Sequence, residues 1–146
     1  MEISVEGVRT SIADWKAAQS ASPEELPTLS PPQQETARRL HVSEEDYARS
    51  ALAGRRSRQK LLQKTERFAR WLQGLLRGKA AGTEIKTVVL NTWDGKFEIT
   101  LHRDGSPVFF RVDEDLVDSL FEGGLRDAEQ RLSHVLDLVL STGVTA

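Results

Sequence analysis

The sequence predicts an α+β fold: a helical hairpin with a long basic helix, a three-stranded antiparallel β-meander, and C-terminal helices. Three observations lead to this prediction. Apolar residues recur at steps of three and four over residues 61–76, and again over residues 125–139, which is typical of amphipathic helices. Between these stretches, two Asp-Gly pairs at 94–95 and 104–105 stand among alternating apolar residues, which indicates two β-hairpins.

The first 32 residues are predicted to form an arm and a proline-rich linker. Ile3 and Val5 alternate with polar residues as in a short strand. Four of the five prolines lie between residues 23 and 32, and proline restricts both its own φ and the residue before it. We therefore expect residues 20–32 to be extended, and residues 33–146 to form a single α+β domain.

Helix starts are marked clearly in residues 33–79, the helical part of that domain. Ser30 precedes two prolines and opens a short helix. Ser43 precedes three acidic residues, which favours the N-terminus of the long helix at residue 44. That helix is expected to continue through Gly54 and to end near Gly78.

The meander, residues 83–112, can be predicted with its register. If both Asp-Gly pairs form two-residue turns, Val88 faces Leu101, Leu90 faces Ile99, and Ile99 faces Phe110. One face then collects the apolar side chains of Val88, Leu90, Phe97, Ile99, Leu101, Val108, Phe110 and Val112. A slip by one residue would scatter this set between the two faces, so the two turns support each other.

The second face of the meander is mixed. Val89, Thr100 and Phe109 are predicted to share one cross-strand row, and Glu98 and Arg111 are predicted to pair in the next. An apolar row on a polar face requires a cover, either from the arm or from a partner.

Residues 113–141 are predicted to be helical. Asp113 caps a short helix, Gly123 and Gly124 interrupt it, and a last amphipathic helix follows. Its apolar stripe is expected to pack against the stripe of the long helix or across a dimer.

Composition limits the class of protein. Of the 146 residues, 38% are hydrophobic and 29% charged, as in globular chains, and no apolar run approaches the length of a membrane span. The first residues lack the features of a secretory signal. Cysteine is absent, which excludes disulfides and favours a cytoplasmic location.

Charge is distributed unevenly. The formal net charge is −2, yet residues 49–79 hold ten basic residues and one acidic residue. Both flanking stretches are acidic, so the chain can neutralise its own basic helix.

No catalytic motif is recognisable. The sequence lacks a nucleophile elbow, a phosphate-binding loop and a dinucleotide fingerprint, and its three histidines have no ligand spacing. The acidic residues at 113–118 are interpreted as helix N-terminal charges rather than as a metal site. We therefore expect no enzyme activity, cofactor, metal or small-molecule substrate.

Two sets of residues are candidates for binding. Exposed aromatic and apolar residues typical of protein interfaces are Val89, Trp93, Phe109 and Trp15. Candidates for contact with nucleic-acid phosphates, spread along one predicted helix face, are Arg55, Arg56, Arg58, Lys60, Lys64 and Arg67.

Three resemblances bear on these candidates. Residues 32–50 resemble a helix-turn-helix, but the second helix begins with acidic residues that phosphates would repel. The order helix, three strands, helix resembles a double-stranded-RNA-binding domain, although residues 124–129 lack the lysine cluster of that family. The stretch ETARRLHVSEEDYARS resembles short segments of tailed-phage assembly proteins.

The sequence thus leads to two functional hypotheses. The first is a non-enzymatic protein-interaction module, an adaptor or assembly subunit such as that of a phage or mobile element, working as a homo-oligomer. The second is a nucleic-acid-binding protein that uses residues 49–79. Because the acidic flanks can neutralise the basic helix, we consider protein binding the stronger of the two hypotheses. No membrane partner is expected.

Overall fold

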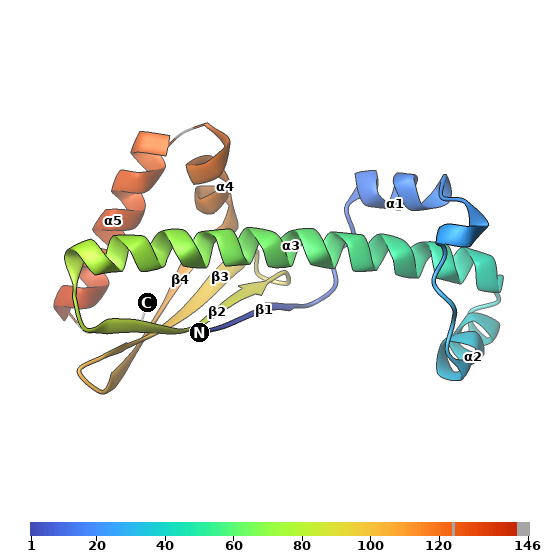
Figure 1. Ribbon diagram of the computed structural model, residues 1–146, viewed down its shortest axis with the longest axis horizontal. Helices are drawn as coiled ribbons and strands as arrows, with labels where there is room; N and C mark the ends of the chain where they lie inside the picture. The colour runs from blue at the N-terminus through green and yellow to red at the C-terminus, as the bar shows by residue number, and fades with distance from the viewer. Residues whose placement is uncertain (124, 143–146) are drawn as a thin grey trace. The chain divides into compact units, whose positions relative to one another are not determined.

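The computed structural model describes residues 1–123 and 125–142, and it confirms the α+β fold (Figure 1). The long helix is a single element of 36 residues. The elements in chain order are β1 (Glu2–Glu6), α1 (Ile12–Gln19), the 3-10 helix η1 (Pro23–Glu25), α2 (Pro31–Arg39), α3 (Glu44–Lys79), β2 (Thr83–Asn91), β3 (Lys96–Arg103), β4 (Ser106–Asp113), α4 (Glu114–Glu122) and α5 (Leu125–Thr142). In the part of the chain described, no helix has both the length and the apolar character needed to cross a bilayer.

The chain forms two compact units, and α3 contributes to both. The sheet unit consists of Met1–Gly7 and Leu61–Ala146, and the helical unit consists of Val8–Lys60. The sheet, α4, α5 and the second half of α3 belong to the first unit. The helices α1 and α2 and the first half of α3 belong to the second.

The sheet has four strands in the order β1-β2-β3-β4, so the predicted count of three is wrong. β1 pairs parallel to β2, with Ile3 beside Val88 and Val5 beside Leu90. Val5 is thereby buried in the core. The alternation of Ile3 and Val5 correctly indicated a strand, but its partner lies more than 80 residues away, and sequence pattern alone does not identify such a partner.

The second hairpin has the predicted register and the first does not. Asp104 and Gly105 both have positive φ, 52° and 81°, as a two-residue hairpin turn requires. Ile99 therefore faces Phe110, as predicted. In the first hairpin four residues, 92–95, separate the paired ends Asn91 and Lys96.

The longer first loop moves β2 by two residues against β3. Leu90 faces Phe97 instead of Ile99, and Val88 faces Ile99 instead of Leu101. Because side chains alternate with a period of two, a shift of two residues leaves each side chain on its predicted face. The predicted apolar face is therefore confirmed, although the predicted register between β2 and β3 was wrong.

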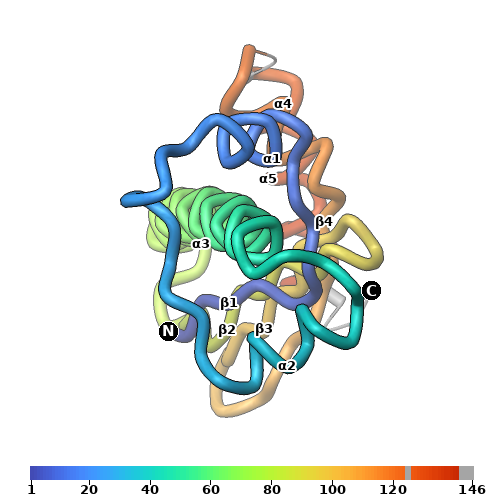
Figure 2. Tube along the Cα trace, turned by 90° about the vertical axis from the view of Figure 1, so that its right-hand side faces the viewer, coloured from blue at the N-terminus to red at the C-terminus, as the bar shows by residue number. Residues whose placement is uncertain are grey.

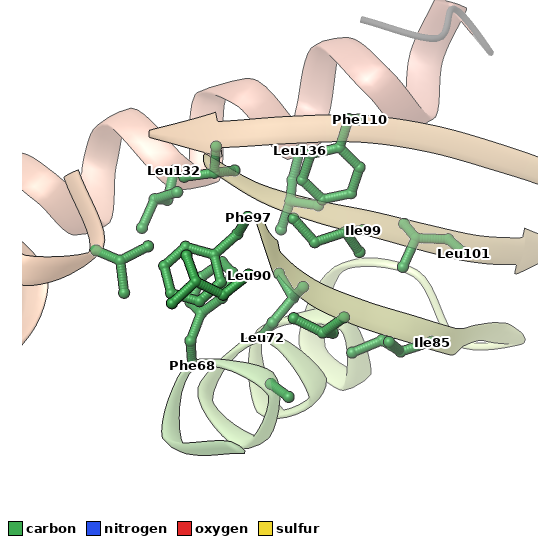
Figure 3. Close-up of a cluster of buried hydrophobic side chains, with 14 of the residues drawn as sticks. Phe68, Leu72, Ile85, Leu90, Phe97, Ile99, Leu101, Phe110, Leu132 and Leu136 are labelled. Carbon is green, nitrogen blue, oxygen red and sulfur yellow. The ribbon is translucent and has the colours of Figure 1, made fainter. Parts of the chain in front are cut away.

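The core lies on that apolar face. Figure 3 shows Phe68 and Leu72 of α3 and Leu132 and Leu136 of α5 converging on the side chains of β2, β3 and β4. The ring centroids of Phe68 and Phe97 are 5.0 Å apart. The two predicted apolar stripes thus meet in one core within the chain, the first of the two arrangements that the sequence allowed.

The helix α4 ends at the glycine that the sequence indicated as its end. Gly123, with φ of 146°, follows its last residue. Gly124 and the side chain of Leu125, assigned above to the helix break and to the last apolar stripe, lie outside the described part.

The helical unit combines small buried apolar residues with polar contacts. One cluster of buried apolar residues consists of Ala18, Ala21, Leu52 and Ala53, with Leu26 packed against it, and Ala37 and Ala48 are buried as well. Figures 1 and 2 show α1 beside the first half of α3. Arg49 of α3 donates hydrogen bonds to the carbonyl oxygens of Ala18, Gln19 and Ala21, at 3.0, 3.1 and 2.7 Å.

The N-terminal caps of α2 and α3 follow the sequence signals, whereas Asp113 precedes α4 without a side-chain capping hydrogen bond. Ser30 and Gln33 form a reciprocal capping box at the start of α2. The Ser43 hydroxyl accepts a hydrogen bond from the Asp46 backbone N–H at 3.0 Å, before α3 begins at Glu44. Both helix starts are therefore confirmed where the caps predicted them.

Candidate functional site

The candidate site is the face of the sheet opposite the core, which we call the open face. Neighbouring residues of β4 show the difference between the two faces, since Phe110 is 2% exposed and Phe109 is 48% exposed. The helices of the sheet unit bury the Phe110 side. Strand alternation therefore presents Phe109 on a face that no described element of this unit packs against.

Phe109 and Val89 border a shallow hollow. Phe109 faces Thr100, and Thr100 faces Thr87. Val89 faces Glu98, so its predicted row with Thr100 is wrong, again because the first loop has four residues. Val89 and Phe109 nevertheless line a common hollow of about 320 Å³. Its lining residues are Thr87, Val89, Glu98, Ile99, Thr100, Phe109, Phe110 and Arg111.

Two charged side chains, Glu98 and Arg111, line this hollow. The predicted pair of Glu98 and Arg111 is present, with 4.0 Å between carboxylate oxygen and guanidinium nitrogen. Asn91 Nδ2 donates to Glu98 Oε1 at 3.0 Å. At the next row, Lys96 lies 3.9 Å from Asp113. These long ion pairs on an exposed surface contribute little to stability.

Trp93 lies in the loop between β2 and β3 and is 76% exposed. Its backbone N–H donates to Asn91 Oδ1 at 3.0 Å. A Cβ added to Gly7 would lie 2.8 Å from the indole Nε1, so the ring lies directly against the Gly7 backbone. The neighbouring Thr92 is bound to the Glu6 carbonyl through both its backbone N–H and its hydroxyl, at 2.9 and 2.7 Å.

The four predicted partner-binding residues therefore divide between the units. Val89, Phe109 and Trp93 belong to the sheet unit, and the first two share the hollow. Trp15 belongs to the helical unit, where it is half exposed on α1 next to the more exposed Ile12.

Most predicted nucleic-acid contacts are engaged within their own unit. Arg56 lies 3.7 Å from Glu25, and Lys60 pairs with Asp14. In the sheet unit Lys64 lies 2.8 Å from Asp118 and 3.7 Å from Glu114, and the Arg67 guanidinium stands 4.2 Å above the Phe121 ring.

Two of the six predicted cations remain without such a partner. Among the residues described, Arg55 and Arg58 form no ion pair, and both are exposed. Of the six cations that the sequence indicated as phosphate contacts, two are therefore exposed without an ion pair among the described residues.

A strongly perturbed titratable group lies in the helical unit. Lys60 and the hydroxyls of Ser57 and Ser11 hold the pKa of Asp14 down to about 2, because they stabilise its ionised form. Asp14 is 4% exposed, so this group joins α1 to α3 instead of facing a cleft. Across residues 1–123 and 125–142, no three histidine or carboxylate side chains gather closely enough to hold a metal ion.

Sequence reasoning missed Gly7 and the acidic residues of β1. Glu2 and Glu6 alternate with Ile3 and Val5, so they project from the open face once β1 joins the sheet. The alternation was visible in the sequence, but without a partner strand it could not place these carboxylates beside Thr87 and Asn91.

Comparisons with protein-family models, with curated proteins and with solved structures found no match for this chain.

Proposed function

We propose that this chain is a non-enzymatic protein-interaction module, an adaptor or assembly subunit, and that the open face is its binding surface. The observation that supports this proposal most directly is the half-exposed Phe109 at the hollow shared with Val89. An aromatic ring beside a pocket, surrounded by polar side chains, is the typical arrangement of an interface hot spot.

Trp93 adds a second anchor that is already ordered. The indole lies against Gly7, and the hydrogen bond from the Trp93 backbone N–H to Asn91 fixes the backbone that carries it. Binding through a restricted side chain loses less conformational entropy than binding through a mobile one. Tryptophan is also among the residues enriched at energetically important interface positions.

The partner is a second protein or a second copy of this chain. Self-association is measured by light scattering across protein concentrations from 0.01 to 1 mM, roughly the range of weak protein complexes. A homo-oligomer gives an average mass that rises with protein concentration, and the Phe109→Ser substitution should lower that mass.

The absence of cysteine favours a cytoplasmic location for this function.

Photocrosslinking tests the proposal directly. A photoreactive phenylalanine replaces Phe109, and the control carries it at Leu138 of α5, which has a similar exposure of 51%. We expect a defined adduct, with a partner or with a second copy, from position 109 only. The adduct partner is then purified, and Phe109→Ser should weaken its binding at least tenfold while Leu138→Ser leaves it unchanged. Equal adducts at both positions, or unchanged binding by Phe109→Ser, refute the proposal.

Nucleic-acid binding is the second candidate, supported by the exposed Arg55 and Arg58. Fluorescence anisotropy with a labelled DNA duplex and a labelled RNA strand at low salt tests it, since phosphate contacts are strongest there. Binding that disappears in the Arg55→Gln, Arg58→Gln variant favours this function. No binding, or binding unchanged in the variant, eliminates it.

A further inference from the structure

The open face carries more acidic than basic residues. Strand alternation places the carboxylates of Glu2, Glu6, Glu84, Glu98 and Asp113 on it. The cations on this face are Lys96 and Arg111, and Lys86 in the β2 bulge lies 3.3 Å from Glu84. Glu2 and Glu6, on the edge strand β1, form no ion pair with any residue that the structure describes.

The hollow combines an apolar wall with a carboxylate. Val89 and Phe109 line it together with Thr87 and Thr100, and its two charged lining residues are Glu98 and Arg111. Lysine and arginine side chains match such a site, because their aliphatic stems pack on apolar surface while the charged end meets a carboxylate. A guanidinium also stacks on an aromatic ring such as Phe109.

Glu98 has acceptor capacity left for such a charge. An ionised carboxylate offers about four lone-pair positions. Asn91 occupies one of them on Oε1, and Arg111, at 4.0 Å, is beyond hydrogen-bond distance. Within the described chain no donor reaches Oε2, and the Glu98 side chain is 34% exposed.

From this chemistry we infer that the open face binds a basic segment of a protein partner and seats an arginine or lysine side chain in the hollow beside Glu98. The inference rests on the proposed function and names the partner of that same surface. Charge complementarity selects this occupant: a copy docked face to face would set the acidic excess against itself, and phosphates would be repelled.

Nuclear magnetic resonance titration of the full chain tests the inference. The probe is the peptide Ac-Arg-Val-Arg-Val-Arg-NH2, and its control has citrulline, a neutral analogue of the same shape, at all three arginines. At low salt we expect the arginine peptide to shift the amide signals of Val89, Glu98, Thr100 and Phe109. The citrulline peptide should bind at least tenfold more weakly.

Variants separate the Glu98 carboxylate from general acidity. Glu98→Gln should weaken binding of the arginine peptide at least fivefold, and Glu98→Asp, which keeps the charge, should restore most of it. Glu122→Gln, at an exposed carboxylate that ends α4, is the matched control and should change nothing. Equal binding of both peptides, shifts confined to other surfaces, or no effect of Glu98→Gln overturns the inference. It is also overturned if a DNA duplex shifts the same amide signals, or if Phe109→Ser abolishes self-association through this face.

The two proposals can fail separately. If position 109 crosslinks a partner and Phe109→Ser weakens its binding, but the arginine peptide does not bind, the partner is not basic and the interaction function stands. If the arginine peptide binds as expected and no partner crosslinks, the interaction function fails while the arginine-binding hollow stands.

Discussion

Trp93 and Gly7 depend on each other at the level of single residues. Gly7 has φ of 87°, a conformation that disfavours any residue with a Cβ. A Cβ there would also lie 2.1 Å from Thr92 Oγ1 and 2.8 Å from the Trp93 indole nitrogen. The missing side chain therefore allows both the backbone turn after β1 and the position of the exposed tryptophan.

Gly7→Ala should destabilise the sheet unit by about 2 to 4 kcal/mol, from the unfavourable φ together with overpacking. Gly74→Ala is the matched control, because Gly74 is exposed within α3 with open space around it. That change should stabilise α3 by up to about 1 kcal/mol. Urea unfolding followed through sheet-unit amide signals measures the free energy of unfolding of both variants. If both substitutions change this free energy in the same direction, the explanation given for Gly7 is wrong.

Asp14 makes the helical unit sensitive to acid. Because Lys60, Ser57 and Ser11 lower its pKa from 3.8 to about 2, folding favours the ionised form. The contribution of ionised Asp14 to the stability of the helical unit is complete above about pH 4 and is lost as the pH falls through about 2. The pH window of this loss therefore extends from the ordinary carboxylate pKa of 3.8 down to about 2.

Asp14→Asn should remove that dependence and loosen α1 at neutral pH. Signal intensities of residues within Val8–Lys60, recorded from pH 5 to pH 1.5, report the effect. The control is Glu35→Gln in α2, whose ion pairs with Arg38 and Arg39 are exposed and long. If the control and Asp14→Asn give the same pH profile, the Asp14 contacts do not stabilise the unit.

At the level of elements, Arg49 joins α1 to α3. Its guanidinium donates to three carbonyl oxygens at the end of α1 and, through Nη2, to the Glu45 carboxylate at 2.8 Å. A planar guanidinium can serve several acceptors at once, whereas a lysine ammonium is a single point of charge. The side chain is therefore a second helix cap, supplied by another helix.

Arg49→Lys should destabilise the contact between α1 and α3 by about 1 to 3 kcal/mol, the cost of leaving carbonyl groups without their donor. Hydrogen exchange of the amides from residue 17 to residue 21 measures it. Arg58→Lys, at an exposed position of the same helix, should leave exchange unchanged. Equal protection in the two variants contradicts the prediction.

In strand β4 two adjacent phenylalanines have opposite environments, since Phe110 is buried in the core and Phe109 is exposed on the open face. Phe110→Ala should cost about 3 to 5 kcal/mol, because it opens a cavity in the core. Phe109→Ala should cost less than about 1 kcal/mol, because that ring lies on the open face. Denaturant unfolding of the two variants compares them directly. A similar loss in both would mean that the open face is covered in the free protein.

At the level of the whole molecule, the two units differ in what stabilises them. The sheet unit has an extensive core built from α3, α4, α5 and all four strands. The helical unit buries five alanines and one leucine, and it leaves large apolar residues such as Val8, Ile12 and Leu40 exposed. Burial of small side chains contributes little hydrophobic free energy.

The helical unit should therefore open at a lower free energy than the sheet unit. Hydrogen exchange followed by mass spectrometry on the intact chain measures the two separately. Peptides from Val8–Lys60 are expected to exchange several-fold faster, or more, than peptides from β2, β3 and β4. Equal protection would indicate that the polar contacts of Asp14 and Arg49 fully replace a larger core.

Much of the open face could be anticipated, since its side chains follow from alternation along each strand. Phe109 and the pair of Glu98 and Arg111 were placed correctly because the second hairpin has the two-residue turn that its Asp-Gly pair indicates. Val89 was placed in the wrong row because a four-residue loop also accommodates an Asp-Gly pair. The hollow itself depends on this register, so its wall could not be derived from the sequence.

The sequence by itself determined the local features of this protein: the caps of α2 and α3, the turn at Asp104 and Gly105, and the face on which each strand residue lies. These depend on backbone preferences and on a period of two or 3.6 residues, which neighbouring residues fully specify. Only the tertiary structure decided that β1 joins β2, that Trp93 lies on Gly7, and that Lys60 and Lys64 of α3 pair within their own units. Such contacts join residues far apart in the chain, and they form only where the packing of the whole unit offsets the entropy of closing the loops between them.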